Sequence, residues 1–226
     1  MASSLSRDKL WLFKPDSSGG FQAPESLGFE PEKADYYPRA LFDHTGNHLA
    51  LVRREMIEIR SYPNGEFTKI PIPFHNRAGQ WSPDGRFLIT TDGGGFCLID
   101  TQNRELIESV EWQIGASRPS WSPDSKFIAI PHALENKIRI WSPGSKSFVR
   151  DVTGHSGRIS CASWHPDGSR LATAEGSNIL LWDTGTWNVL GVLRKHQQTI
   201  RDLEWSPDGK SLLSLGTDQL LVWDLD

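Results

Sequence analysis

The stretch WSPDG at residues 81–85 decides the fold, because close relatives of it occur at four other places in the chain. These are FDHTG at 42–46, WSPDS at 121–125, WHPDG at 164–168 and WSPDG at 205–209. Their leading aromatic residues are separated by 39, 40, 43 and 41 residues. A period near 40 residues is typical of propellers and solenoids rather than of an ordinary globular domain.

Each repeat has the same internal order of short apolar runs and turns. In the second repeat the turn is followed by RFLITT (86–91), FCLID (96–100) and RELIESV (104–110). Such runs, rich in Ile, Leu, Val and Phe, predict strands, and no segment has helical periodicity. In the turn, proline fixes φ, Asp or Ser bonds the backbone, and Gly accepts positive φ. We therefore interpret the repeated phrase as scaffold and not as a catalytic element.

Residues 37–226 resemble the WD-repeat β-propeller family. The resemblance is strongest in 154–183 and 195–224, which match the family's Gly-His start, aromatic-Pro-Asp-Gly middle and Trp-Asp close, with Lys195 replacing the Gly. PSWSPDSKFIAI (119–130) is also similar to the related Pro-Asp type of propeller repeat. The resemblance implies an all-β propeller of four-stranded antiparallel blades. Its repeats are centred on residues 42, 81, 121, 164 and 205.

The resemblance also implies a buried hydrogen-bonded set of a His, a Ser or Thr, an Asp and the Trp in the best repeats. By position, two copies supply three members each: His155, Thr173 and Trp182, and His196, Ser214 and Trp223. Ser177 takes the approximate place of the aspartate in the first copy, and Asp218 lies one residue close to its Trp in the second. We therefore expect at most a partial network.

Five repeats leave open whether the ring closes. We divide the chain into an N-terminal segment, 1–36, and the propeller, 37–226. Residues 9–13 (KLWLF) are the candidate closing strand, since no other early segment is as strand-like, although they also read as part of an earlier, otherwise missing blade. An incomplete or open ring would leave an unpaired sheet edge and an apolar flank, both of which invite another chain.

Composition excludes several classes of protein. A net charge of -4 and a pI near 6.0 give no global attraction to nucleic acid or anionic membrane. No apolar run approaches the roughly 18 residues of a membrane span, and the first residues do not resemble a signal peptide. Cys97 and Cys161 lie in apolar, strand-like contexts, which fits a reducing compartment. We therefore expect a cytoplasmic or nuclear protein that is not secreted.

The sequence has no enzyme signature. GHSG (154–157) lacks the final glycine and the following helix of a nucleophile elbow. DGGGF (92–96) has no helix after it to bind a phosphate. The seven histidines have no metal-ligand spacing. We predict a protein that is not an enzyme and uses neither cofactor nor metal.

One pattern does indicate binding. The loops that enter the first strand of repeats two to five contain no acid and carry Arg77, Arg118, Arg158, Lys195 and Arg201. In a propeller these loops share one face, where they would attract an acidic or phosphorylated peptide. We predict a scaffold for protein–protein interaction that uses this face or an open blade edge. Nucleic-acid binding by the same loops, a propeller fragment of a larger or enzyme-associated assembly, and solvated charges without a partner remain alternatives.

Overall fold

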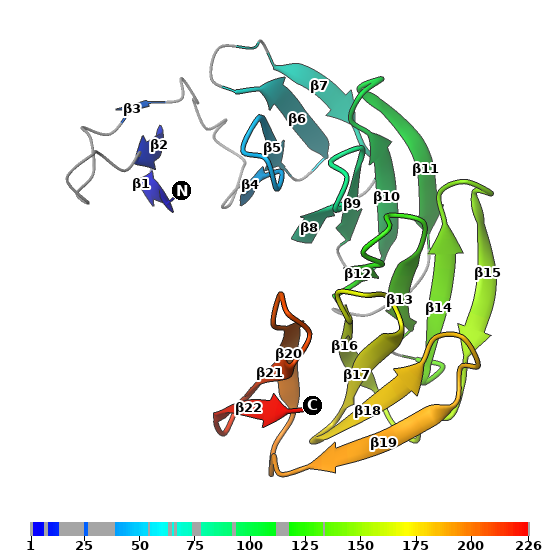
Figure 1. Ribbon diagram of the computed structural model, residues 1–226. Coiled ribbons are helices and arrows are strands. Elements are labelled where there is room, and N and C mark those ends of the chain that lie inside the picture. Colours follow the sequence, from blue (N-terminus) through cyan, green and yellow to red (C-terminus); the bar gives the residue numbers. More distant parts are fainter. Residues whose placement is uncertain are drawn as a thin grey trace.

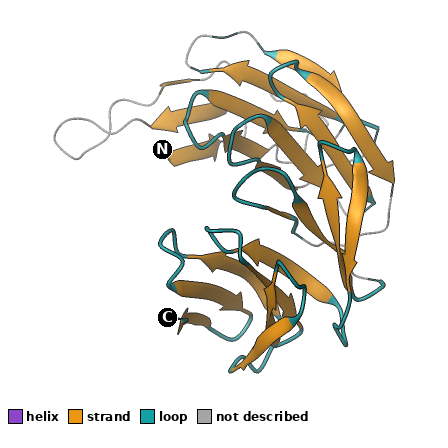
Figure 2. Ribbon diagram, turned by 45° about the vertical axis from the view of Figure 1, so that its right-hand side comes forward, coloured by secondary structure: helices purple, strands orange, loops and turns teal. Residues whose placement is uncertain are grey.

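The computed structural model describes residues 2–6, 9–13, 25–26, 39–53, 55–62, 65, 67–73, 78–91, 94–111, 118–132 and 134–225. Every regular element among these residues is a β-strand, and all paired strands are antiparallel. Figure 2 shows the strands gathered into successive sheets. The predicted all-β class is confirmed.

Five sheets follow one another, one for each sequence repeat, and we call them blades 1 to 5. Blade 1 contains β4 (Arg39–Phe42), β5 (His48–Val52), β6 (Met56–Ser61) and β7 (Thr68–Pro71). Blade 2 contains β8 (Ala78–Trp81), β9 (Phe87–Thr91), β10 (Gly95–Asp100) and β11 (Glu105–Glu111). Blade 3 contains β12 (Ser120–Trp121), β13 (Ile128–His132), β14 (Lys137–Ser142) and β15 (Ser147–Val152).

Blade 4 contains β16 (Ile159–Trp164), β17 (Arg170–Glu175), β18 (Asn178–Asp183) and β19 (Val189–Arg194). Blade 5 has three strands, β20 (Ile200–Trp205), β21 (Ser211–Gly216) and β22 (Leu220–Asp224). The sixth sheet contains β1 (Ala2–Ser6), β2 (Lys9–Phe13) and β3 (Glu25–Ser26). In each sheet, strands that are consecutive in sequence are hydrogen-bonded neighbours.

The blades are arranged as an arc around a common centre (Figure 1). The first strand of each blade lies on the inside of the arc and the last strand of blades 1 to 4 lies on the outside. Every blade therefore presents its connections at two ends. One end carries the turns between first and second and between third and fourth strands. The other carries the loops between blades and the turns between second and third strands, and we call it the loop face.

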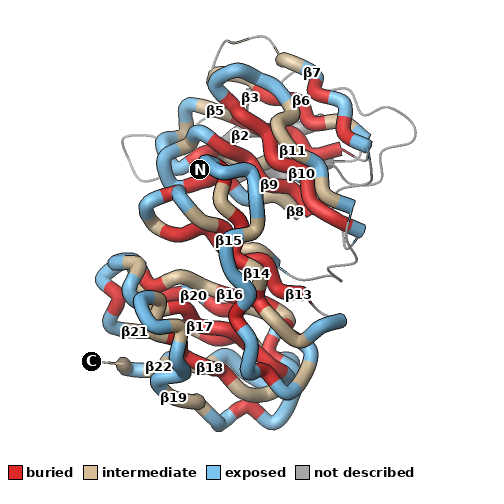
Figure 3. Tube along the Cα trace, turned by 90° about the vertical axis from the view of Figure 1, so that its right-hand side faces the viewer, coloured by how far each residue is buried: buried red, intermediate tan, exposed pale blue. Residues whose placement is uncertain are grey.

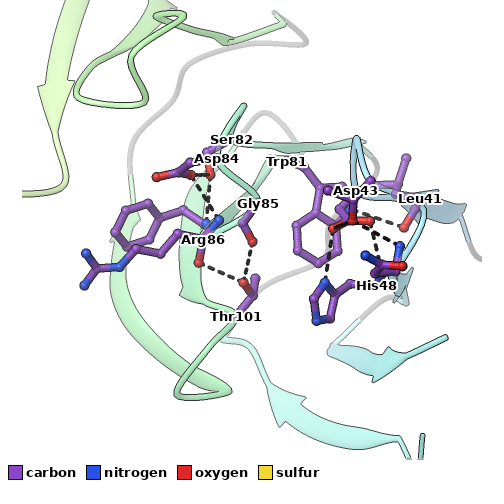
Figure 4. Close-up of polar contacts among 12 residues, drawn as sticks. Leu41, Asp43, His48, Trp81, Ser82, Asp84, Gly85, Arg86 and Thr101 are labelled. Carbon is purple, nitrogen blue, oxygen red and sulfur yellow. Dashed lines mark hydrogen bonds and ion pairs between the residues drawn. The ribbon is translucent and has the colours of Figure 1, made fainter. Parts of the chain in front are cut away.

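The repeated phrase forms the turn between the first two strands, as predicted. In blade 2, Ser82 Oγ donates to Asp84 Oδ1 at 2.5 Å, and the same carboxylate oxygen accepts from Arg86 N at 3.0 Å (Figure 4). Gly85 has φ 71°, a left-handed conformation that favours glycine. The same carboxylate-capped turn recurs at Asp124 and Asp208. The phrase is thus a local device for reversing the chain.

The hydrophobic core lies between consecutive blades, where buried side chains from two sheets form clusters. Figure 3 shows that the buried residues are concentrated in the strands. Successive residues of a strand point to opposite faces, so neighbours on one strand belong to different seams. In β9, Leu88 packs toward blade 1 and Ile89 toward blade 3. Each fully buried side chain of this size contributes about 1.5–3 kcal/mol. Stacking of neighbouring blades therefore supplies most of the apolar stabilisation.

The repeated tryptophan links its blade to the preceding one. The indole Nε1 of Trp81 donates to Leu41 O at 3.1 Å (Figure 4), and that of Trp205 donates to Ser163 O at 3.1 Å. Trp121 donates in the same way to Gln80 O at 3.3 Å. In blade 4 the indole Nε1 is buried without a hydrogen-bond partner among the described residues. The seam between blades 3 and 4 therefore lacks a bond that the other three seams have.

The arc is open, which confirms an incomplete propeller as one of the predicted forms. Its two ends, β1–β3 and blade 5, do not meet in Figure 1. The candidate closing strand, residues 9–13, is β2, and within the described residues it does not pair with residues 219–224. Both hydrogen-bonding edges of β2 are used, by β1 on one side and by β3 on the other. Residues 9–13, the candidate closing strand, therefore pair within their own sheet and not with blade 5.

Candidate interaction surfaces

The loop face of blade 5 is held by a complete four-member network. Trp223 Nε1 donates to Ser214 Oγ at 2.8 Å, and His196 Nε2 lies 2.8 Å from the same hydroxyl. His196 Nδ1 lies 2.9 Å from Asp218 Oδ1. Asp218 Oδ2 accepts from Gln197 N at 2.9 Å, and this backbone donor, with His196, lowers the carboxyl pKa to about 2. Asp218 thereby ties the entering loop of blade 5 to its own strands.

The expectation of at most a partial network is therefore wrong for blade 5. The second and third strands are joined by a tight turn through Thr217 and Asp218, closed by a bond from Gly216 N to Gln219 O at 2.9 Å. In this short turn the Asp218 side chain reaches the histidine despite its spacing from Trp223. Asp218 follows His196 by 22 residues, and Ser177 follows His155 by the same number. Ser177 therefore stands in blade 4 where Asp218 stands in blade 5.

Blade 4 keeps three members of the network, as expected. Thr173 Oγ1 lies 2.8 Å from His155 Nε2 and accepts from Trp182 Nε1 at 2.8 Å. His155 Nδ1 is buried without a hydrogen-bond partner among the described residues. Burial lowers the pKa of His155 to about 4, so the ring is neutral at pH 7. Glu175 supplies the bond to the entering loop that Asp218 makes in blade 5. Its carboxylate accepts from Ser156 N at 2.8 Å and from the Ser156 hydroxyl.

In blade 4 the Trp182 indole donates to the Thr173 hydroxyl, and blades 2 and 3 each retain only one partner of that hydrogen bond. In the register of blade 2, Thr90 takes the place of the blade 4 threonine, but Ile99 stands where the tryptophan would be. In blade 3, Trp141 is present and Ile130 replaces the threonine. Thr90 Oγ1 and Trp141 Nε1 are consequently buried without hydrogen-bond partners among the described residues. The network weakens steadily from blade 5 toward blade 2.

The entering loop of blade 3 and the beginnings of β16 and β20 lie side by side. Arg118 N donates to Ser160 O at 3.3 Å, and Ser160 Oγ donates to Ile200 O at 2.7 Å. Arg118, one of the predicted binding residues, forms an ion pair with Asp202 of blade 5. Its charge is thus compensated by a carboxylate that is 84 residues away in sequence. Sequence reasoning missed Asp202 because only the fold brings the two together.

Three of the other predicted residues, Arg158, Lys195 and Arg201, are exposed on the loop face. Within the described part of the chain, no carboxylate is paired with any of them. Arg77 lies outside the described residues. The loop face also carries Glu175 and Asp218, but both carboxylates are held by donors of their own blades. Among the described residues of blades 4 and 5, the uncompensated charge on this face is therefore positive.

Where the first strands converge, a cavity of about 330 Å³ opens at the centre of the arc. Its charged lining residues are two cations, Arg39 and Arg118, and two anions, Asp202 and Glu204. Because these charges are balanced, the cavity gives no net attraction to an anion or a cation. The positive charge of the loop face lies outside it.

Blade 5 presents an apolar end face. Leu215, Leu220 and Val222 are 45%, 58% and 68% exposed, and Leu213 lies on the same face, opposite Val222 in the register. The corresponding residues of blade 4 are all buried against blade 5: Ala172, Ala174, Ile179 and Leu181. The outer edge of β22 is likewise unpaired among the described strands. This end has the chemistry of an inter-blade seam with one side uncovered.

The described residues contain no group of three or more His, Cys, Asp or Glu side chains arranged to hold a metal ion. A search of the same residues finds no helix long and apolar enough to cross a membrane. Both cysteines, Cys97 and Cys161, are buried and form no disulfide among the described residues. Burial raises the pKa of Cys161 to about 12, so it is not a nucleophile at neutral pH.

The family model described as WD domain, G-beta repeat matches residues 146–183 and 187–224. Each match begins near the outer strand of one blade and continues through three strands of the next. Among curated proteins, the chain is 34% identical to "Anaphase-promoting complex subunit cdh1" of Dictyostelium discoideum over 46% of this chain and 14% of the relative. It is 29% identical to "Protein FIZZY-RELATED 3" of Arabidopsis thaliana over 46% of this chain and 23% of the relative. The chain spans less than a quarter of either relative.

Among solved structures, the chain is similar to a chain of "Kuenenia stuttgartiensis Hydrazine Synthase", with a TM-score of 0.69 and 19% identity. The alignment covers 83% of this chain and 57% of that one. At this identity the similarity concerns the fold alone. It supports the radial arrangement of blades and carries no argument about chemistry.

Proposed function

We propose that this chain, which belongs to the WD-repeat β-propeller family, is a non-catalytic scaffold that binds other proteins. The relatives support this role, since one of them is named as a subunit of a multiprotein complex. The residues that could have suggested catalysis have structural positions instead: Ser156 bonds to Glu175, and His155 and His196 bond to the hydroxyls beneath them. We propose the cytoplasm or the nucleus as its compartment.

The observation that carries the proposal is the trio of exposed cations on the loop face. Arg158 and Lys195 lie on the entering loops of blades 4 and 5, whose backbones are bound by Glu175 and Asp218. Arg201 is an exposed residue at the beginning of β20. A fixed group of uncompensated cations attracts carboxylates and phosphates and loses little entropy on binding. The partner surface that fits it is an acidic or phosphorylated peptide segment.

A charge-reversal experiment tests this surface. The double variant Arg158→Glu, Arg201→Glu should weaken binding of a labelled glutamate-rich decapeptide at least ten-fold, measured by fluorescence anisotropy. Lys146→Glu is the matched control, because Lys146 is an exposed cation in a turn at the opposite end of the blades. Equal binding by wild type and the double variant would exclude the loop face as the acidic-peptide site.

Nucleic acid is the second candidate ligand, favoured by the same three unpaired cations. If three cations contact the phosphates of a single strand, log K should fall with log salt with a slope of about −2. An oligonucleotide that fails to bind at low salt, while the acidic peptide binds, removes this alternative.

The apolar end face of blade 5 provides a second mode of partner binding. An exposed strand edge beside a leucine-rich face accepts a strand from another chain. Val222→Lys should abolish association that depends on this face, measured by sedimentation across a range of concentrations. Leu134→Lys is the control, since Leu134 is 67% exposed in a turn of blade 3 and Val222 is 68% exposed. Identical sedimentation of wild type and both variants, as monomers, would refute this mode for self-association.

A further inference from the structure

The end of the blades opposite the loop face carries a groove between blades 3 and 4. Its volume is about 610 Å³, within the range of about 300–1,000 Å³ typical of ligand pockets. The residues that give it its character come from both blades and from their turns: Asp124, Phe127, Arg150, Trp164, Asp167 and Trp187. It shares no residue with the loop face or with the end face of blade 5, and it does not depend on either proposal.

This groove coincides with the seam that lacks a tryptophan-to-carbonyl bond. The indole N–H of Trp164 has no acceptor among the described residues, although Trp81, Trp121 and Trp205 each donate to the preceding blade. Trp164 instead packs edge-to-face on Trp187, with ring centroids 6.0 Å apart and an interplanar angle of 89°. A buried donor without an acceptor costs about 1–3 kcal/mol. The Nε1 atom is covered in the free chain, so a ligand carbonyl would bond to it after a small shift of the Trp164 ring.

Trp187 reaches the groove from a strained backbone position. It lies in the turn between β18 and β19 with φ 61°, a conformation that is unusual for a bulky side chain. Its ring is perpendicular to that of Trp164, so the two indoles form adjoining walls of a corner. The guanidinium of Arg150 lies 5.8 Å from the Trp187 ring centroid. The turn thus places a large aromatic surface beside solvent at a seam.

Two carboxylates stand at the rim, one in the first turn of each blade. Hydrogen bonds from Ser169 lower the pKa of Asp167 to about 2. Burial would raise the pKa of Asp124, but hydrogen bonds from the Ser122 hydroxyl and the Lys126 backbone lower it. Both groups are therefore anionic at neutral pH, and Arg150 is the cation among the charged residues that line the groove. Lys126, just outside the groove, lies 3.3 Å from Asp124 Oδ2, so Asp167 is the carboxylate of the two that has no Lys or Arg partner among the described residues. The rim favours a basic group.

We propose that this groove binds a proline-rich extended segment with a basic residue beside the prolines. Proline rings pack on aromatic walls, and the polyproline II conformation is already formed before binding. Proline has no backbone N–H to satisfy, and its carbonyls are free to accept from the Trp164 indole. Asp124 and Asp167 attract the flanking Lys or Arg. The occupant thus matches the aromatic walls, the unpaired donor and the acidic rim together.

The neighbouring seam offers an internal comparison. A groove of the same volume, about 610 Å³, lies between blades 2 and 3, and no tryptophan lines it. Half of its lining residues are charged, among them Arg86, Glu105 and Lys126. Its aromatic lining residues are Phe87 and Phe127, and it has neither the perpendicular pair of indoles nor an indole donor, so it should bind the same segment at least ten-fold more weakly. A variant in it serves as a control.

The test uses the full chain and labelled decapeptides in a fluorescence anisotropy titration. The probes are a Pro-x-x-Pro peptide followed by Arg, the same peptide with both prolines replaced by Ala, and one with Arg replaced by Glu. We expect the first peptide to bind at least ten-fold more tightly than either of the others. Amphipathic helical and glutamate-rich peptides test the other occupants.

Two protein variants locate the site. Trp187→Asn removes one wall while Asn tolerates positive φ, and should weaken the first peptide at least ten-fold. Trp164→Phe removes a donor that has no partner among the described residues of the free chain, so it should weaken binding roughly three- to ten-fold and leave the unfolding midpoint nearly unchanged. Arg86→Ala, in the neighbouring groove, should leave binding unchanged.

Three results would overturn the proposal: equal binding of the proline and alanine peptides, wild-type affinity in both tryptophan variants, or preference for the helical or acidic peptide. Loss of dimers in Trp187→Asn without any peptide binding would show that a second copy occupies the groove, and would also overturn it. Should Trp187→Asn fail to fold, the peptide series and Trp164→Phe still decide the outcome.

Discussion

Replacing Thr173 by valine should destabilise the propeller far more than its change in shape suggests. Thr173 is fully buried, and its hydroxyl is the sole partner within the described residues for both Trp182 Nε1 and His155 Nε2, at 2.8 Å each. Valine has the same shape but leaves two buried polar groups unpaired, at about 1–3 kcal/mol each. The added methyl group recovers about 0.8 kcal/mol. We expect a net loss of about 2–4 kcal/mol in the free energy of unfolding.

Urea denaturation at pH 7, followed by circular dichroism, measures this loss as a lower midpoint at constant slope. Thr173→Ser is the matched control: it keeps the hydroxyl and loses one methyl group, at about 1 kcal/mol. Ser214→Ala makes the corresponding change in blade 5, where His196 Nε2 is left unpaired but Trp223 is only partly buried and its indole can bond to water. Its cost should be smaller, about 1 kcal/mol. Equal stability of Thr173→Val and Thr173→Ser would refute the assignment of stabilisation to the hydroxyl.

Three further outcomes follow from the same network. Trp182→Phe should cost at least about 1 kcal/mol more than Trp141→Phe in urea denaturation, because only the Trp182 indole N–H has a partner. Ser177→Asp should supply an acceptor to His155 and raise the pKa of that histidine from about 4, measured by NMR titration; an unchanged pKa would contradict the proposed alignment of the blades. The Asp218 carboxyl has a pKa lowered to about 2 from 3.8, so its contribution is present above pH 4 and is lost as pH falls toward 2. The stability difference between wild type and Asp218→Asn should shrink over that interval, and a constant difference would argue against stabilisation by the hydrogen bonds of the Asp218 carboxylate.

The sequence predicts this fold well because its decisive signals are local. The turn around Asp84 and strands such as β9 and β10 follow from residues that are adjacent in the chain. Contacts between blades depend on the curvature of the whole arc, which no local pattern encodes. The ion pair of Arg118 with Asp202 is such a contact, and so is the missing acceptor of Trp164. For the candidate surfaces, the sequence therefore identified basic residues but not which of them are compensated.

The distribution of the histidine networks indicates that blades 1 to 3 depend on apolar packing, whereas blades 4 and 5 also have fixed entering loops. Apolar clusters hold all four seams, so blades 1 to 3 stack without a complete network. What blades 4 and 5 gain is a fixed entering loop, through Ser156 N on Glu175 and Gln197 N on Asp218. The exposed cations Arg158 and Lys195 lie on these two loops. Because ordering a loop in advance lowers the entropy lost on binding, the networks persist where the proposed ligand contacts lie and decay where packing alone suffices.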